Sequence, residues 1–225
     1  MKPVSRRTLS LVVVSSLIAC MIIPACNKNS NNYNPGNSTS SLWPLKAGNT
    51  WIYKDSVFSD SALQSTYPDT ITLTSKTYAD PSSGLLFSEL YNPNGWFGTG
   101  SYVSVTPDNS TIYEMDSSTN SPYIFFGTTY GDGVQIGTGA DYSNPACPNY
   151  FTQYGFISTT SINGYTCLKN IEYTTNCSNV NTEAVVYYVS PGVGVVRMED
   201  YIADSTHNNT LYLNFSQTLQ SVKLN

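Results

Sequence analysis

The stretch AVVYYVSPGVGVVRMEDY, residues 184–201, determines the fold class that the sequence predicts. The apolar run Ala184 to Val189 and the segment Gly194 to Tyr201, which begins with Gly-Val-Val, flank the dipeptide Pro191-Gly192. Val and Tyr favour the extended backbone of β-strands, whereas Pro and Gly favour turns. The stretch therefore predicts two neighbouring strands that are joined by a tight turn.

Segments of the same kind recur on both sides of this stretch, and clusters of Gly, Pro, Asn, Asp and Ser separate them. We expect further strands at residues 51–54, 70–74, 85–91, 102–106, 111–115, 123–126, 156–161, 165–174, 211–215 and 219–224. Many short strands separated by turn signals are typical of an all-β, mostly antiparallel domain. A curved sheet, an open barrel and a sandwich all fit, and residues 42–225 are long enough to form one such domain.

The N-terminus has the layout of an export signal. Lys2, Arg6 and Arg7 form a positively charged start, and an apolar run from Leu9 to Ala25 follows them. This run is shorter than the roughly 20 apolar residues that a membrane-spanning helix needs, and it contains Pro24. We therefore interpret residues 1–25 as a signal peptide.

Two short motifs inside this segment resemble the lipobox of bacterial lipoproteins. They are LIAC, residues 17–20, and IPAC, residues 23–26. The resemblance implies that the Cys of one motif is modified with a lipid and that the chain is cut just before it. Cys26 is favoured over Cys20, because the polar run NKNSNN follows it and suits a solvated tether.

Residues 26–41 would then be a flexible tether, and the protein would be anchored to the outer membrane of a bacterial cell envelope, on its periplasmic or its surface face. Cleavage as an ordinary secreted protein, after Ala19 or Ala25, is the alternative. The membrane, reached through this lipid, is the first partner that the sequence implies, and an envelope protein or a glycan is the second.

Composition excludes one large class of partner. Without residues 1–25 the chain has seven basic and 15 acidic residues, a net charge of −8. Binding to nucleic acid needs clustered Lys and Arg that neutralise phosphates. No such cluster occurs, so we expect no nucleic-acid partner, and no motif indicates a cofactor.

Three cysteines follow the lipobox, namely Cys147, Cys167 and Cys177. Disulfides persist in the oxidising compartments that exported proteins reach. Cys167 and Cys177 could form a bridge across a hairpin, and Cys147 could pair with either of them. One thiol is left over in each case.

Candidates for catalysis are weak in this sequence. The only histidine, His207, lies among Asp, Ser, Thr and Asn residues that predict a turn, and no Gly-x-Ser-x-Gly motif accompanies it. Paired carboxylates could hydrolyse sugars. Those available in or beside strands are Glu114, Glu172, Glu183, Glu199 and Asp200. We expect them to point to solvent, as strand carboxylates usually do.

Two other groups of residues are candidates for binding. Trp96 and Phe97 lie between Asn94-Gly95 and Gly98, which predicts a loop tip with exposed aromatic rings. A folded-back loop that buries both rings fits equally well. Asp132 and Asp141 lie in a Gly-rich stretch and are weak candidates for calcium, whose ligands are oxygens.

Two longer motifs carry a family resemblance. The segment WPLKAGNTWIY, residues 43–53, and the segment YVSPGVGVVR, residues 188–197, resemble motifs of uncharacterised exported lipoproteins of the Bacteroidota. The resemblance implies no catalytic residue. Structurally, Gly48-Asn49 predicts a turn before a strand in which Trp51 fills the core, and residues 191–194 predict a second turn.

These observations favour a non-catalytic envelope lipoprotein with a binding or structural role. A carrier that holds an apolar ligand in a curved β sheet is the first alternative, and it would need an apolar concave face. A glycan-active enzyme is the second, and it would need two carboxylates that face one another.

Overall fold

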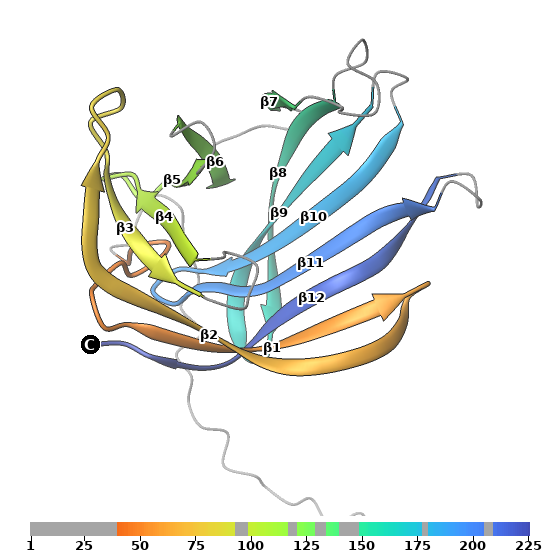
Figure 1. Ribbon diagram of the computed structural model, residues 1–225, viewed down its shortest axis with the longest axis horizontal. Helices are drawn as coiled ribbons and strands as arrows, with labels where there is room; N and C mark the ends of the chain where they lie inside the picture. Colours follow the sequence, from red (N-terminus) through yellow and green to blue (C-terminus); the bar gives the residue numbers. More distant parts are fainter. Residues whose placement is uncertain are drawn as a thin grey trace, which may run out of the picture.

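The computed structural model describes residues 40–92, 99–116, 121–128, 134–139, 149–176, 180–204 and 209–225. These residues form a single sheet of twelve strands, in which every neighbouring pair is antiparallel (Figure 1). The strands are β1 Thr50–Ser59, β2 Ala62–Ala79, β3 Leu86–Tyr91, β4 Thr99–Val105, β5 Thr111–Asp116, β6 Ser121–Gly127, β7 Val134–Gly139, β8 Asn149–Ile162, β9 Tyr165–Thr175, β10 Asn181–Ser190, β11 Gly194–Asp204 and β12 Thr210–Lys223. The predicted all-β, antiparallel class is confirmed.

The order of strands across the sheet is β6-β5-β4-β3-β2-β1-β12-β11-β10-β9-β8-β7. Consecutive strands therefore pair with one another, except β6 and β7, which form the two edges of the sheet. The pairing of β1 with β12 joins the first strand to the last. The sheet curls strongly, so that β3 to β6 stand opposite β8 to β10 (Figure 1). Of the three predicted architectures, the observed one is the curved, open sheet.

The turns follow the predicted chemistry. Asn163 and Gly164 connect β8 to β9, and their φ angles of 51° and 80° lie in the left-handed region that Asn and Gly tolerate best. Residues 191–193 connect β10 to β11, as the opening stretch predicts. Gly194 begins β11, where the predicted strand also starts, and its φ is +100°.

Several strands are longer than predicted. The expected strand at residues 70–74 is the middle of β2, which runs for 18 residues. The expected strand at residues 51–54 continues to Ser59 in β1. Local apolar alternation ends where these strands become polar, but pairing between the backbones of β1 and β2 continues as far as Ser59 and Ala62.

The core lies inside the curl, and the residues before β1 fill it. Leu42 and Trp43 are fully buried, and the Trp43 ring packs edge-on against Trp51 with 5.7 Å between ring centroids. Trp51 Nε1 donates a hydrogen bond to the Val193 carbonyl at 2.6 Å. Trp51 is fully buried, which confirms the prediction that it fills the core. Ser41 also belongs to the folded part, because its carbonyl accepts a hydrogen bond from the Gly192 amide.

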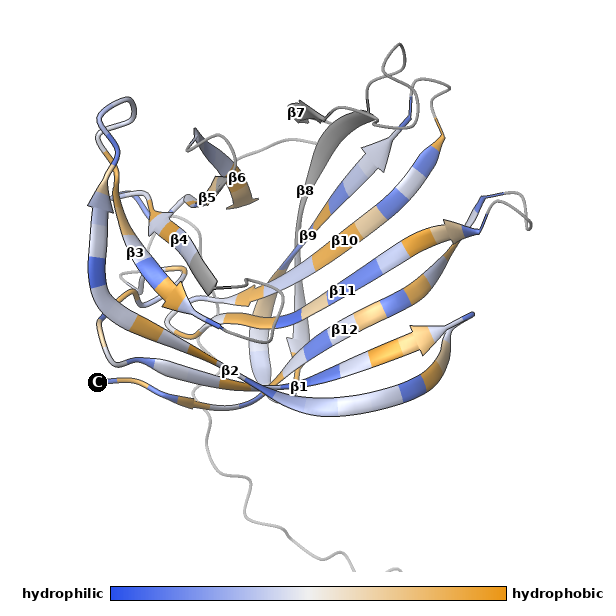
Figure 2. Cartoon of the chain, in the orientation of Figure 1, coloured by the Kyte–Doolittle hydropathy of each residue, from blue (hydrophilic) through white to orange (hydrophobic). Residues whose placement is uncertain are grey.

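Hydropathy alternates along the C-terminal strands. Figure 2 shows hydrophilic and hydrophobic residues in turn along β10, β11 and β12. This alternation is the pattern of strands whose two faces differ in environment. Hydropathy alone, however, does not identify which of the two faces of these strands is the inner one.

Candidate functional site

The inner face of the sheet is identified by contacts between strands that are far apart in the sheet. The rings of Phe125 on β6 and Tyr187 on β10 lie 4.5 Å apart, and Asn170 Nδ2 on β9 donates to the Gly127 carbonyl at 3.3 Å. Such contacts are only possible across the inside of the curl. Tyr187 and Asn170 therefore point inward.

Alternation along each strand then places acidic side chains on this inner face. Glu183 on β10 and Glu172 on β9 lie two or four residues from Tyr187 and Asn170. Asp200 on β11 pairs with Val185, which lies between Tyr187 and Glu183 on the same face. The sequence-based expectation that these three carboxylates point to solvent is therefore wrong.

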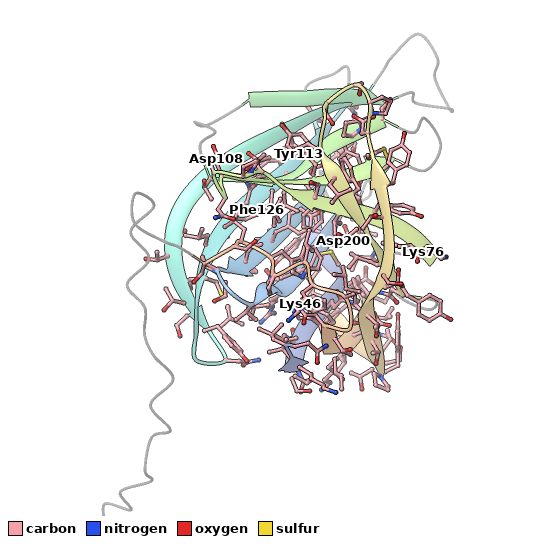
Figure 3. All side chains as sticks on the ribbon, turned by 90° about the vertical axis from the view of Figure 1, so that its left-hand side faces the viewer. Lys46, Lys76, Asp108, Tyr113, Phe126 and Asp200 are labelled. Atoms are coloured by element: carbon pink, nitrogen blue, oxygen red, sulfur yellow. The ribbon has the colours of Figure 1, made fainter. Side chains whose placement is uncertain are left out.

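Two further carboxylates share the inner face nearer the core. Tyr187 pairs with Met198, Met198 with Gln217, and Gln217 with Asp55, so this row crosses four strands on one face. Asp69 on β2 pairs with Tyr53, which lies two residues before Asp55. We call this set the inner carboxylates: Asp55, Asp69, Glu172, Glu183 and Asp200. In Figure 3 Asp200 lies within the body of the molecule, whereas Lys76 lies at its edge.

The inner carboxylates have no basic partner within the part of the chain that the structure describes. The ion pairs found there are Lys76–Glu89 at 3.1 Å and Arg197–Glu199 at 2.6 Å, and neither includes one of the five. Burial without a counter-charge disfavours the ionised form of a carboxylate. Three of the five, Asp55, Glu172 and Glu183, should therefore hold their protons to unusually high pH.

The pKa values of Glu172, Glu183 and Asp55 shift in that direction. Burial raises the pKa of Glu172 to about 7, and the negative charges of Glu183 and Glu114 add to the effect. Burial and the charge of Asp200 raise the pKa of Glu183, against a hydrogen bond from Thr174. Burial is also the main cause that raises the pKa of Asp55 to about 6; the nearby Gln217 amide opposes this shift, and the charge of Asp69 adds to it.

The remaining acids that the sequence singled out are arranged differently. Glu199 lies on the outer face, where Arg197 pairs with it and the hydroxyls of Tyr188 and Tyr201 donate to its Oε2 at 3.1 Å. Glu114 accepts a hydrogen bond from the Tyr123 hydroxyl at 2.6 Å. Glu199 is thus held in a network on the outer face, and Glu114 contributes to the inner site through its charge.

Asp55 and Asp69 were not among the residues that the sequence singled out, although a signal for them exists. Asp55 continues the alternation of the buried Trp51 and Tyr53, and Asp69 continues that of Ile71 and Leu73. A carboxylate in the apolar phase of a strand indicates a buried charge, and buried charges need an explanation.

Other predicted site residues lie outside the described residues, and their predicted roles stay predictions. They are Cys20, Cys26, Trp96, Phe97, Asp132, Asp141, Cys147, Cys177 and His207. Cys167 is described: it is a free, buried thiol that donates to the Tyr165 carbonyl. Burial raises its pKa to about 12. A disulfide between Cys147 and Cys177 remains a prediction.

An open cleft of about 380 Å³ lies where the end of β1 separates from β11 and β12. Its lining residues are Phe58, Ser59, Asp60, Ile202, Ala203, Asp204, Tyr212, Leu213 and Asn214. Within the described ranges, no group of three or more His, Cys, Asp or Glu residues is arranged to hold a metal ion. The same ranges contain no helix with the length and apolar character to cross a membrane.

Comparison with known proteins gives likenesses of fold only. No protein-family profile and no curated protein matches the chain. A predicted lipoprotein of Parabacteroides distasonis is similar over 83% of this chain and 100% of its own, with 17% identity and a TM-score of 0.46. A predicted exported protein of Bacteroides fragilis with a YmcC-like fold is similar over 82% of this chain and 100% of its own, with 11% identity and a TM-score of 0.46.

A LolA superfamily protein of Nitrosomonas europaea is also similar, over 81% of this chain and 88% of its own. Its identity is 10% and its TM-score is 0.25. At these scores none of the three likenesses assigns a function to the chain, and no family membership follows from them.

Proposed function

We propose that the chain is a non-catalytic binding domain of the bacterial cell envelope, held at the outer membrane by a lipid on Cys26. The signal-like N-terminus, the lipobox and the polar residues 27–41 support the anchoring. Three of the inner carboxylates, Glu172, Glu183 and Asp200, support the binding role, and they are the observation that carries this proposal.

The ligand should donate hydrogen bonds or carry positive charge. Glu172, Glu183 and Asp200 are acceptors on the inner face that have no basic partner among the described residues. Charged acceptors form the stronger hydrogen bonds in proteins. A glycan that bears amino groups combines hydroxyl donors with positive charge, and is the class we favour.

The apolar-carrier alternative is less well supported by the inner face. Trp51, Phe125 and the other inner apolar side chains pack against the chain's own Leu42 and Trp43. These surfaces are therefore already covered and would have to lose contacts to hold a lipid. Release of Trp43 from the core would also give up its edge-on contact with Trp51.

A specific observation keeps the glycan-active enzyme as a second candidate. A general acid works best when its pKa lies near the operating pH, and glycosidases pair such a group with a second carboxylate. Glu172 has a pKa of about 7, and the charge of Glu183 acts on it. The same residues would then bind and cleave a glycan.

The test uses two oligosaccharides of equal length, one cationic and one neutral. Calorimetric titration with a glucosamine hexamer, which is cationic, is expected to show binding that weakens with added salt. The neutral N-acetylglucosamine hexamer should bind more weakly. The double variant Glu172→Gln/Glu183→Gln should lose the difference, whereas the control Asp108→Asn, in the exposed turn after β4, should keep it.

Equal affinity of the double variant and the unaltered protein for the cationic hexamer would contradict the proposed binding site. Product analysis of the same mixtures separates the two candidate functions. Cleavage that Glu172→Gln abolishes would favour the enzyme, and intact hexamer with retained binding would favour the binding domain.

A further inference from the structure

Four polar side chains meet near the core, where β1, β2 and β12 lie side by side. They are Asp55, Asp69, Asn92 and Gln217, and their exposed fractions are 0%, 4%, 0% and 1%. We call them the carboxylate–amide cluster. Asn92 follows directly after β3, so the cluster joins the two halves of the sheet.

Hydrogen bonds hold three members of the cluster together. Asn92 Nδ2 and Gln217 Nε2 each donate to Asp69 Oδ2 at 3.0 Å. Asp69 Oδ1 accepts from the Thr70 amide at 2.8 Å. Both amide groups thus point at one carboxylate oxygen.

The fourth member, Asp55, accepts no hydrogen bond of good geometry, because the Gln217 amide that lies beside it donates to Asp69 instead. Neither Oδ1 nor Oδ2 of Asp55 has a donor, and Asn92 Oδ1 and Gln217 Oε1 also lack one. All four atoms are acceptors, and a buried acceptor without a donor costs free energy. The cluster therefore has more acceptors than donors, and a cation or further hydrogen-bond donors would satisfy them.

The neighbouring side chains do not supply what is missing. The Tyr53 hydroxyl, on the same face, already donates to the Val195 carbonyl at 2.8 Å. Asp55 pairs with Gln217 across β1 and β12, and with Tyr67 across β1 and β2, so it faces no basic residue in either ladder. Asp69 lies diagonally from Asp55 on the same face, at the spacing of about 7–8 Å or less that lets long or polar side chains interact.

We propose that the carboxylate–amide cluster binds a calcium ion. Asp55 and Asp69 supply two carboxylates, and Asn92 and Gln217 supply amide oxygens after a half-turn that exchanges oxygen and nitrogen without changing the shape of the side chain. Carboxylates and amide oxygens are calcium ligands, and a set without His or Cys does not suit zinc or copper. Magnesium is less suited because it usually keeps several waters, and this cluster is buried.

This proposal does not depend on the glycan ligand, because none of the four residues belongs to the Glu172–Glu183 pair. Calcium alone is the probe. The melting temperature of the purified domain should rise with added calcium chloride, saturate, and fall again with EDTA, as for any ligand that binds the folded state. Terbium bound in place of calcium should show luminescence excited through the adjacent tyrosines Tyr53 and Tyr67.

Asp55→Asn is the main variant, because Asp55 accepts no hydrogen bond whose loss would disturb the fold. It should weaken calcium binding by at least about tenfold, as disruption of metal-site residues commonly does. Gln217→Glu adds a third carboxylate and should tighten calcium binding, since affinity follows the number of charged ligands. A merely structural role of Gln217 gives destabilisation without tighter binding.

Asp108→Asn serves as the control, because it removes one acidic charge from an exposed turn far along the chain from the cluster. Its calcium response should equal that of the unaltered protein. The proposal is overturned if calcium leaves the melting temperature unchanged, if Asp55→Asn binds calcium normally, or if Asp108→Asn loses as much affinity as Asp55→Asn.

Discussion

Replacing Glu172 with Gln is expected to stabilise the protein at alkaline pH and to leave its stability unchanged in acid. The pKa of Glu172 rises from 4.5 to about 7 in the folded protein. The folded state therefore holds this proton more tightly than the unfolded state does. The resulting penalty is absent below pH 4.5, grows between pH 4.5 and 7, and is complete above pH 7.

The size of the penalty follows from the shift. A difference of about 2.5 units between 4.5 and about 7 corresponds to about 3 kcal/mol, at about 1.4 kcal/mol per unit. Gln keeps the shape of Glu and carries no charge at any pH. The gain in the free energy of unfolding should thus approach about 3 kcal/mol at pH 8, as an upper limit because the side chain is only partly buried.

The groups that face Glu172 are acidic or phenolic. Glu183 on β10 and Glu114 on β5 raise its pKa, and the buried hydroxyl of Tyr187 lies in the same region. Removing the charge of Glu172 should therefore also ease the ionisation of Tyr187, whose pKa its charge helps to raise. No neighbour among these three would lose a favourable ion pair in the variant.

Urea denaturation between pH 4 and pH 9, followed through the fluorescence of the buried Trp43 and Trp51, measures the effect. Glu89→Gln is the matched control, because hydrogen bonds from Thr74 and Lys76 lower the pKa of Glu89. That variant should lose stability at neutral pH and recover in acid, the opposite sign. A gain for Glu172→Gln that is the same at pH 4 and pH 9 would refute the reasoning.

Three further predictions concern the core, the thiol and the anchor. Gly194→Ala should destabilise the protein by about 1–3 kcal/mol more than Gly84→Ala. Both glycines have positive φ, but only at Gly194 would a Cβ collide with the Trp43 ring. Equal losses of unfolding free energy in urea denaturation would contradict this. Cys167, with a pKa of about 12, should resist iodoacetamide in native protein at pH 8 and react in urea, and fast native labelling would contradict its burial. Mass spectrometry of the membrane fraction should find a lipid on an N-terminal Cys26, whereas a soluble, unmodified mature protein would exclude the anchor.

The sequence predicts the strands well where both faces of a strand differ in polarity. The buried Ile71 and Leu73 alternate with Thr residues, and β2 was expected around them. It predicts the ends of strands poorly, because backbone pairing extends β2 to Ala62 through polar residues that a local pattern assigns to a loop. Turn chemistry is more reliable, since the φ angles at Asn163 and Gly164 depend on those residues themselves.

Glu172, Glu183 and Asp200 were expected on the solvent face, and this expectation failed for a physical reason. In β9 the polar residues Asn170, Glu172 and Thr174 face inward, while Ile171 and Tyr173 lie on the other face. The rule that the polar phase of a strand faces water therefore gives the wrong side here. Only contacts across the curl, such as that between Phe125 and Tyr187, reveal which face is enclosed, and no local pattern encodes them.

Measuring the unfolding free energy and the hexamer affinity of the same Glu172→Gln variant tests why this buried carboxylate is present. Glu172 costs the folded protein free energy at neutral pH, and Gln in its place would remove that cost. Buried groups that destabilise a fold are most simply explained by function. If Glu172→Gln is more stable and binds the cationic hexamer less well, its charge serves the ligand. If the variant is more stable and binds equally well, the charge serves neither role, and the binding site must lie elsewhere on the sheet.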